Sequence, residues 1–331
     1  MQLKAEDISI AVTMYRRLDY IEQALDSAVN QTVPVRVRLY DDGCQDEARL
    51  KQILARFGDR VEYCRNPVTL GLFRNMNACI QNSPTPWLSI LHDDDLLSKD
   101  FVERILEVAP EVERCSLFCG GTVFLTPDGH PFHWSGPPAD VRWKKISAED
   151  YALKNWFAFP GQLMHAASAN AVGGFPVKSI YTGDWELWFR LAMIDGVVQL
   201  GAKLGHHRAH LGADRGTTTA AKSGRKSACC GMQVKRNLAR LRQSGRPVTY
   251  DRRKWLEAYG PLYRDLLVYT WKMPTWLLRY NRRLMLLTHQ TGRASRLIQL
   301  SSRLFGTPAL RVAGLLRNWV VRFGLRTPQT F

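Results

Sequence analysis

The sequence predicts an α/β protein with a doubly wound, mostly parallel central sheet flanked by helices. Over residues 1–100, short β-branched runs alternate with stretches whose apolar residues recur at helical spacing. This alternation is typical of parallel strands joined by crossover helices. Polar residues such as Thr13, Asp41 and Asp93 follow the strand candidates, and sheets of this kind bind ligands beyond the carboxyl ends of their strands. With 331 residues and 45% hydrophobic content, the chain can bury a large core.

The elements of the first part follow in a regular order. The run "ISIAVT" predicts a first strand, and Leu18, Ile21 and Leu25 recur at helical spacing after it. The same reading along the chain predicts strands at 8–13, 35–40, 61–64 and 87–91, with helices at 18–32, 46–57 and 71–82.

The pattern is looser after residue 100. A hairpin is predicted between Cys115 and Trp134, turning at Asp128 and Gly129, and a helix at 184–194. The stretch 205–227 is rich in Gly, Thr and Ser and lacks periodicity, which is typical of a loop or linker. From about residue 231 the chain is expected to be helical and basic.

Three consecutive aspartates, Asp93 to Asp95, end the apolar run "WLSIL". An acidic triplet alone favours a solvated turn. At the end of a buried strand it also suits a hard divalent cation, which prefers oxygen ligands and uses one or two protein carboxylates.

The order of the motifs carries more information than any single one. "VTMYRR", "QTVPVRVRLYDDG", "NPVTLGLFRNMN", "HDDDLLSKDF", "GGF" and "GDWELWFRLA" follow one another. Together they resemble the GT-A glycosyltransferases of family 2, inverting enzymes that use nucleotide-sugar donors. The resemblance covers roughly residues 7–215. It implies a catalytic domain at 1–215, with a nucleotide-sugar half at about 1–100 and an acceptor half at about 101–215. A flexible linker at 216–230 and a basic helical region at 231–331 would follow.

The resemblance implies donor contacts at the strand ends. Asp42 would accept the N3–H of a uracil or thymine ring, and Thr13 and Tyr15 would pack on and hydrogen-bond the base. Arg74 matches a family arginine near the nucleotide, where a guanidinium suits a phosphate or a base edge. The alternatives are that Asp42 caps the helix near Asp46 and that Arg74 pairs with a local acid.

The acidic triplet falls where the family has its Asp-x-Asp signature. Asp94 is the expected ligand of Mn²⁺ or Mg²⁺, and Asp93 and Asp95 are expected beside it, in contact with the nucleotide-sugar. His92 stands where the signature has its first aspartate, which leaves the role of this residue open. Some family members supply a late histidine to the metal or diphosphate, and His210 is the match by position; a surface histidine is the alternative.

An inverting transfer needs a base that deprotonates the acceptor hydroxyl. By resemblance this base is Asp184, at the start of the predicted helix, with Gly183 where an acid is frequent in the family. Glu186 and Arg190 are expected to hold this helix against the sheet. The alternatives are that Asp184 is a helix cap only and that Tyr15 and Trp185 are core aromatics.

Charge and composition suggest partners and a compartment. The net charge is +16, and no acidic residue follows Asp265, whereas basic residues recur to the C-terminus. Basic helices carrying Leu, Trp and Phe suit an anionic membrane surface, and self-association through them is the alternative. No recognised nucleic-acid motif accompanies the charge. The seven cysteines lack a metal spacing, and neither an export signal nor a run of about 20 apolar residues is present. A cytoplasmic protein, peripheral on the inner face of the inner membrane, is expected.

These observations predict a metal-dependent inverting glycosyltransferase. The expected partners are a UDP- or dTDP-sugar donor and a glycan acceptor, lipid-linked in cell-surface polysaccharide assembly, with no nucleic acid. An inactive GT-A scaffold and a basic nucleic-acid-binding protein are the competing hypotheses.

Overall fold

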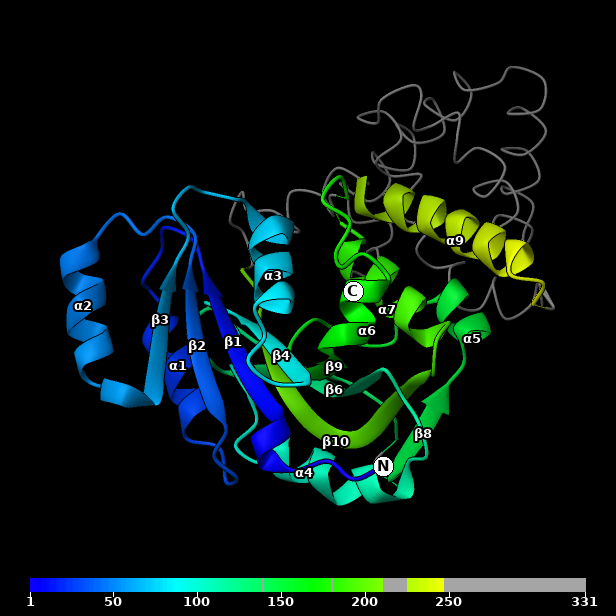
Figure 1. Cartoon of the computed structure of the whole chain (residues 1–331), viewed down its shortest axis with the longest axis horizontal. Helices are drawn as coiled ribbons and strands as arrows, with labels where there is room; N and C mark the ends of the chain where they lie inside the picture. The colour runs from blue at the N-terminus through cyan, green and yellow to red at the C-terminus, as the bar shows by residue number, and fades with distance from the viewer. Residues whose placement is uncertain (139, 180, 211–224, 247–331) are drawn as a thin grey trace, which may run out of the picture. The chain divides into compact units, whose positions relative to one another are not determined.

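The computed structural model describes residues 1–138, 140–179, 181–210 and 225–246 (Figure 1). By its internal contacts the chain divides into two units. The first contains residues 1–151 and 155–211, and the second contains residues 152–154 and 212–331. Among the described residues, no helix has the length and apolar character needed to cross a membrane.

The first half of the sheet is the predicted parallel arrangement. Its strands β1 (Ile8–Met14), β2 (Arg36–Asp41), β3 (Val61–Arg65) and β4 (Trp87–His92) stand in the order β3-β2-β1-β4, and every neighbouring pair is parallel. The crossovers are α1 (Ile21–Val29), α2 (Glu47–Ala55) and α3 (Leu72–Gln81), with a short 3₁₀ turn, η2 (Gly58–Arg60), before β3. Every residue of β1 is buried, as its continuous β-branched sequence indicates.

The second half of the sheet is mixed. It continues β4-β9-β6-β10-β5, with β7 added to β6 and β8 added to β10. Only the β10–β6 pair is parallel in this described half. The strands are β5 (Leu96–Leu97), β6 (Leu117–Leu125), β7 (Pro131–Ser135), β8 (Trp143–Ile146), β9 (Gln162–His165) and β10 (Val197–Arg208). The helices are α4 (Phe101–Val108), α5 (Ala148–Leu153), α6 (Ala166–Ala171) and α7 (Gly183–Ala192), and the 3₁₀ turns are η1 (Ala5–Asp7) and η3 (Ala109–Glu111).

The predicted hairpin is confirmed. Strands β6 and β7 pair antiparallel, and Gly129 takes a positive φ of 93° in the turn between them. The amide of Gly129 donates to the carbonyl of Thr126 at 3.0 Å, which closes the turn.

The stretch predicted as a loop at 205–227 is shorter than expected. Strand β10 continues to Arg208, and helix α9 (Arg225–Gln243) already covers part of the expected 216–230 linker. A break in register between Gln199 and Gly205 hides the strand pattern, because it disturbs the alternation of inward and outward side chains. The predictions for residues 211–224 and 247–331 lie outside the described residues.

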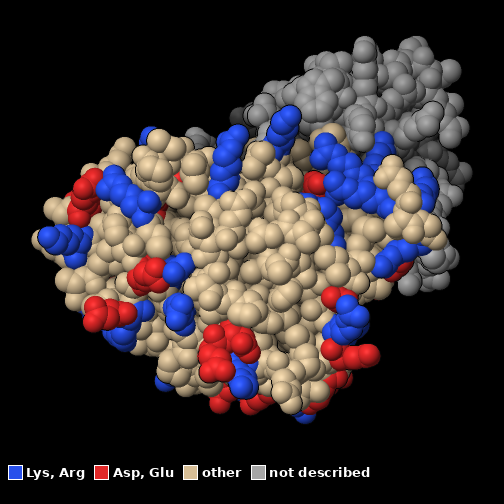
Figure 2. All heavy atoms as spheres, in the orientation of Figure 1, with Lys and Arg blue, Asp and Glu red and all other residues tan. Residues whose placement is uncertain are grey.

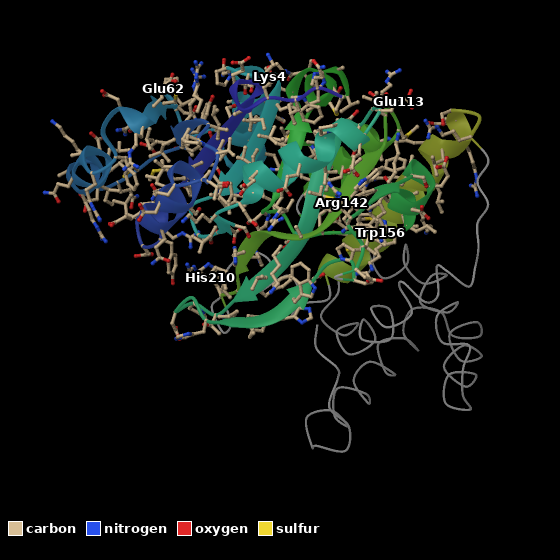
Figure 3. All side chains as sticks on the ribbon, turned by 90° about the horizontal axis from the view of Figure 1, so that it is seen from below. Lys4, Glu62, Glu113, Arg142, Trp156 and His210 are labelled. Atoms are coloured by element: carbon tan, nitrogen blue, oxygen red, sulfur yellow. The ribbon has the colours of Figure 1, made fainter. Side chains whose placement is uncertain are left out.

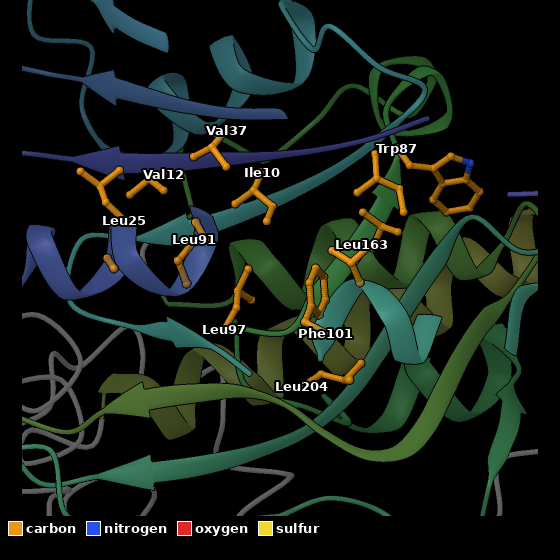
Figure 4. Close-up of a cluster of buried hydrophobic side chains, with 14 of the residues drawn as sticks. Ile10, Val12, Leu25, Val37, Trp87, Leu91, Leu97, Phe101, Leu163 and Leu204 are labelled. Carbon is orange, nitrogen blue, oxygen red and sulfur yellow. The ribbon is translucent and has the colours of Figure 1, made fainter. Parts of the chain in front are cut away.

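A single cluster of buried side chains joins β1 to helices α1, α2 and α4. Ile10 and Val12 of β1 lie near Leu25 of α1, and Phe101 of α4 closes the cluster farther along the sheet (Figure 4). This packing fixes β1 and β4, whose ends carry the predicted site.

Candidate functional site

The ends of β1, β2 and β4 lie side by side, as the sequence predicts. Thr13 is in register with Tyr40 of β2 on one side and with His92 of β4 on the other. The Oγ1 of Thr13 lies 3.1 Å from Nδ1 of His92 and donates toward the carbonyl of Leu91 at 3.3 Å. The loop after β1 and the turn formed by Asp93 to Asp95 after β4 therefore lie together at one edge of the sheet. We call residues 93–95 the acidic turn.

Arg17, which the sequence reading missed, neutralises this edge. Its Nη2 lies 3.7 Å from Oδ1 of Asp93 and 3.5 Å from Oδ2 of Asp94. The backbone amide of Tyr15 also donates to Asp93, at 3.4 Å. The Arg-Arg pair in "VTMYRR" was a visible signal, but sequence alone does not show which cation faces the acids.

Asp94 and His210 meet directly. The Nε2 atom of His210 lies 2.9 Å from Oδ2 of Asp94, and the His210 ring lies beside that of Tyr20, with 5.9 Å between ring centroids. His210 follows the end of β10, next to the β6–β7 hairpin (Figure 3). Burial acts to raise the pKa of Asp94, but His92, the hydrogen bond to His210 and the Arg17 charge outweigh it and lower that pKa.

This pair fits a divalent cation as a partial ligand set. A carboxylate and an imidazole are donors that Mn²⁺ accepts, and such ions commonly complete their shell with substrate phosphates and water. Among the described residues, no group of three or more His, Cys, Asp or Glu side chains could hold a metal by itself. The protein thus offers two ligands here, and a diphosphate would have to supply others.

Asp93 is the most perturbed carboxyl group of the edge. Burial and the adjacent Asp94 charge raise the pKa of Asp93 to about 7, although Arg17 acts in the opposite direction. Asp93 therefore keeps its proton to a higher pH than an ordinary aspartate.

Asp95 points into the protein. Its side chain is 1% exposed, and Oδ1 accepts the backbone amide of Arg208 at 2.9 Å and lies 3.1 Å from Nδ1 of His207. These contacts tie the acidic turn to the end of β10. Asp95 thus fixes the shape of the turn that presents Asp94.

Arg208 also holds the acidic turn in place. Its guanidinium, in a residue only 2% exposed, donates to the carbonyl of Asp94 at 3.0 Å and to that of Pro127 at 2.9 Å. It also donates to Oε1 of Gln23 at 2.8 Å and lies over the Tyr20 ring at 4.3 Å. One side chain therefore joins the acidic turn, the hairpin turn and α1.

Asp42 is buried at the end of β2 and holds the loop before α3. Its Oδ1 accepts from Nδ2 of Asn66 at 2.9 Å and from the amide of Leu70 at 2.7 Å, and its Oδ2 accepts from the amide of Gly71 at 2.8 Å. Asp46, not Asp42, caps α2, by accepting the amide of Arg49. The alternative role of Asp42 as cap of this helix is therefore excluded.

The remaining predicted donor contacts are exposed. Tyr15 is 43% exposed, and the guanidinium of Arg16 lies 4.8 Å from the centre of its ring. Arg74 is exposed on α3 and forms no ion pair with the described residues, so the alternative, pairing with a local acid, is absent from this part of the chain. Both side chains are accessible to a ligand.

Asp184 lies in the first turn of α7. Nδ2 of Asn155 donates to Oδ2 of Asp184 at 3.2 Å, and this asparagine comes from the irregular segment before β9. The neighbouring Trp185 is a core aromatic, 2% exposed, whose Nε1 donates to the carbonyl of Tyr151 at 2.7 Å. The hydrogen bonds of Asp184 and Trp185 thus hold the start of α7 in place.

The "GGF" motif is a clamped turn. Arg190 of α7 donates to the carbonyls of Val172 and Gly174, and Asn77 of α3 exchanges two hydrogen bonds with the backbone of Phe175, at 2.7 and 2.9 Å. Gly174 has a φ of 62°, and a Cβ there would lie 2.4 Å from Oδ1 of Asn77. The turn therefore requires glycine and positions α7 relative to α3.

Aromatic rings connect His92 to the neighbourhood of Asp184. The His92 ring stacks on Phe159 with 4.3 Å between centroids, and Phe159 lies 6.2 Å from Phe175. Phe175 in turn stacks on Phe73, which contacts Gly183. His92, which the family resemblance aligns with the first aspartate of the signature, is thus part of a row of packed rings that leads from the end of β4 to the start of α7.

The comparisons with known proteins agree with this geometry. Residues 9–173 match the family model described as Glycosyl transferase family 2. An uncharacterized glycosyltransferase of Rickettsia conorii is 22% identical over 187 residues, covering 56% of this chain and 31% of the relative. One of Rickettsia typhi is 25% identical over 200 residues, covering 57% of this chain and 60% of the relative. The chain therefore spans about a third to three fifths of the length of these curated relatives.

A solved structure shares the fold. The crystal structure of S. aureus TarS 1-349 in complex with UDP-GlcNAc has a TM-score of 0.55 at 13% identity, covering 96% of this chain and 92% of that chain. At this identity the likeness shows the fold alone.

Proposed function

Since this chain belongs to glycosyltransferase family 2 through its GT-A domain, we propose that it transfers a sugar from a nucleotide-sugar to a glycan acceptor with inversion at the anomeric carbon. The observation that carries the proposal is the pairing of Asp94 with His210 at 2.9 Å, on the edge where β1, β2 and β4 end. TarS, which shares the fold, was crystallised with UDP-GlcNAc, and this supports a UDP-sugar donor; a dTDP-sugar is the other candidate.

The donor would lie across the ends of β1 and β2. In this proposal the base stacks near Tyr15 and donates its N3–H toward Asp42, whose carboxylate is held in place by the loop before α3. Arg74, which is exposed on α3, would direct its guanidinium toward the diphosphate. Thr13 keeps the floor of this site fixed through His92.

Asp94 and His210 would hold Mn²⁺ or Mg²⁺, which, when bound, offsets the charge of the leaving diphosphate. Arg17 already lies against Asp93 and Asp94, so it stabilises the acidic turn before the ion and donor arrive. In this proposal Asp93, beside Asp94 on the same turn, would accept a hydrogen bond from the sugar.

Asp184 would act as the general base. The acceptor hydroxyl gives its proton to the Asp184 carboxylate as its oxygen attacks the anomeric carbon, and the bond to the nucleoside diphosphate breaks on the opposite face. Asn155 orients the carboxylate through Oδ2, and the position of Asp184 in the first turn of α7 favours its charged form.

The proposed acceptor and location rest on the family resemblance and on the basic C-terminal sequence. We infer a lipid-linked glycan of cell-surface polysaccharide assembly, reached from the cytoplasmic face of the inner membrane by the basic region at 231–331. Self-association through that region is the alternative.

A second candidate function is a GT-A scaffold that has lost catalysis. The departures at His92 and Gly183 favour it, because both positions are acidic in the family pattern. A thermal-shift screen of nucleotide-sugars with and without Mn²⁺, followed by release of nucleotide from the donor that binds, separates the two. Metal-dependent stabilisation and turnover support the enzyme. Stabilisation without turnover on any acceptor mixture supports the scaffold, and no stabilisation at all contradicts both.

A further inference from the structure

The surface around the start of α3 combines exposed apolar side chains with cations. Val68 is 65% exposed, Leu72 is 56% exposed and Val177 is 46% exposed. Arg74 and Lys178 are exposed beside Leu72 and Val177 in the chain. We name Val68, Leu72, Val177 and Lys178 the α3 surface; Arg74, which the proposed function assigns to the donor, borders it in the chain.

Buried contacts join α3, which carries Leu72, to the segment that carries Val177. Phe73, next to Leu72, stacks on Phe175 with ring centroids 5.9 Å apart. Asn77 of α3 also donates to and accepts from the backbone of Phe175. Val177 follows in the same clamped segment, so Leu72 and Val177 lie on neighbouring parts of a fixed scaffold.

The two segments that build this surface carry no negative charge. No Asp or Glu occurs in residues 66–92 or in residues 151–183. In the view of Figure 2, Lys and Arg side chains stand at the upper edge above α3, whereas most acidic side chains of that face lie along its lower edge. Exposed leucine and valine side chains beside Lys178 and Arg74 match the chemistry of an anionic lipid surface, into which leucine and valine insert while a lysine remains with the head groups.

The surface adjoins the proposed acceptor side of the site. The Phe73 ring lies directly against Gly183, the residue before Asp184. A lipid-linked acceptor held at a membrane would thus present its sugar close to the proposed base.

From these observations we infer that the α3 surface is a membrane-contacting surface of the catalytic domain, which inserts Leu72 and Val177 at the boundary of an anionic bilayer. This inference deepens the proposed function, since it gives the lipid-linked acceptor its direction of approach. It is separate from the basic region at 231–331, because it concerns residues of the catalytic domain.

The test uses the full chain and vesicles of phosphatidylcholine alone or with phosphatidylglycerol. The variant Leu72→Ser/Val177→Ser is compared with Ile194→Ser, a control that removes a side chain of similar exposure, 43%, from outside the α3 surface. Flotation measures binding, and hydrogen exchange with and without vesicles locates it. Exchange also verifies that both variants fold.

The inference predicts protection of residues 68–74 and 175–179 on anionic vesicles only. It also predicts that the double variant loses this protection and that its partition onto vesicles falls about tenfold, while Ile194→Ser behaves as the wild type. The inference would be overturned if the wild type bound the vesicles without protection of these residues. It would also be overturned if the double variant bound the vesicles as well as the wild type. Protection that appears without vesicles and rises with protein concentration would also overturn it, in favour of a second copy of the chain.

Failure of this inference differs from failure of the proposed function. In the proposed function, metal-dependent binding of a nucleotide-sugar in vesicle-free buffer depends on Asp42, Asp94 and His210 and not on the side chains of Leu72 or Val177. A protein that binds the donor but not the vesicles contradicts only the membrane surface, and one that binds the vesicles but no donor contradicts only the enzyme.

Discussion

Phe73 of α3 occupies the space that a side chain at Gly183 of α7 would need. A Cβ at position 183 would lie 2.4 Å from Cζ of Phe73, closer than real Cβ atoms approach a ring. Gly183, where the family resemblance leads us to expect an acid, is therefore matched by an aromatic ring on a neighbouring helix. This pairing explains how α7 begins so close to α3.

Gly183→Ala should destabilise the domain. The added methyl group must push Phe73 aside, and overpacking of this kind costs about 1–3 kcal/mol. Urea unfolding measures the loss. In Phe73→Leu/Gly183→Ala the smaller leucine leaves room for the added methyl group. The double variant should therefore lose less free energy of unfolding than the two single variants lose together. Additive losses would contradict the contact.

The stability of the metal-free protein should fall as pH rises from about 4 to about 7. Asp93 has a folded pKa of about 7 against an ordinary value of 3.8, so below the ordinary value its contribution is fully present. That contribution is lost as pH rises through the folded pKa, and it amounts to at most about 4 kcal/mol at 1.36 kcal/mol per pKa unit. Unfolding in EDTA between pH 4 and 8 checks this.

Asp93→Asn should remove most of that slope, because asparagine stays neutral over the whole range. Asp59→Asn, an exposed aspartate of η2, serves as the control and should leave the slope unchanged. A slope that survives in Asp93→Asn would show that another group is responsible.

Much of the edge could be predicted from the sequence because strand ends are local features. Thr13, Asp42 and Asp94 each follow a buried β-branched or apolar run, and parallel strands bring such ends together. His210 could be placed only through the family resemblance, and the structure then set it beside Asp94.

The supporting residues could not be predicted, since their partners are distant in the chain. Arg208 lies 114 residues from Asp94, and the sequence assigned its segment to a loop. Arg17 could have faced any of several acids, and the burial of Asp95 depends on β10 lying against the acidic turn. Long-range packing, not local pattern, determines these roles.

Arg208→Met should destabilise the domain more than the loss of an exposed arginine. The change leaves the carbonyls of Asp94 and Pro127 without their donor in a buried place, and hydrogen bonds from a charged group contribute about 1.5–3 kcal/mol each. We expect a loss of about 3–5 kcal/mol in urea unfolding. Arg104→Met, at an exposed arginine of α4, should cost less than about 1 kcal/mol. Similar losses in both variants would contradict the role of Arg208.

Asp94→Asn and His210→Gln should each weaken metal-dependent binding of a nucleotide diphosphate by about tenfold or more. The reason is that this carboxylate and this imidazole, 2.9 Å apart on the edge, are the ligands that the proposal assigns to the ion. Calorimetric titration of UDP with and without Mn²⁺ measures the effect. His130→Gln, at an exposed histidine of the hairpin turn, is the matched control. Unchanged Mn²⁺ dependence in both site variants would remove the proposed metal site.

Asp184→Asn should abolish transfer while leaving donor binding intact. The amide keeps the shape of the side chain but accepts no proton from the acceptor hydroxyl, and the loss of a general base lowers the rate by about 100- to 10,000-fold. The turnover number with acceptor present should fall, whereas Mn²⁺-dependent affinity for the donor and the unfolding midpoint should stay near those of the wild type. Asn155→Ala, which removes the hydrogen bond to Oδ2, should lower the rate less, because the carboxylate remains. A well-folded Asp184→Asn with wild-type turnover would assign the base to another residue.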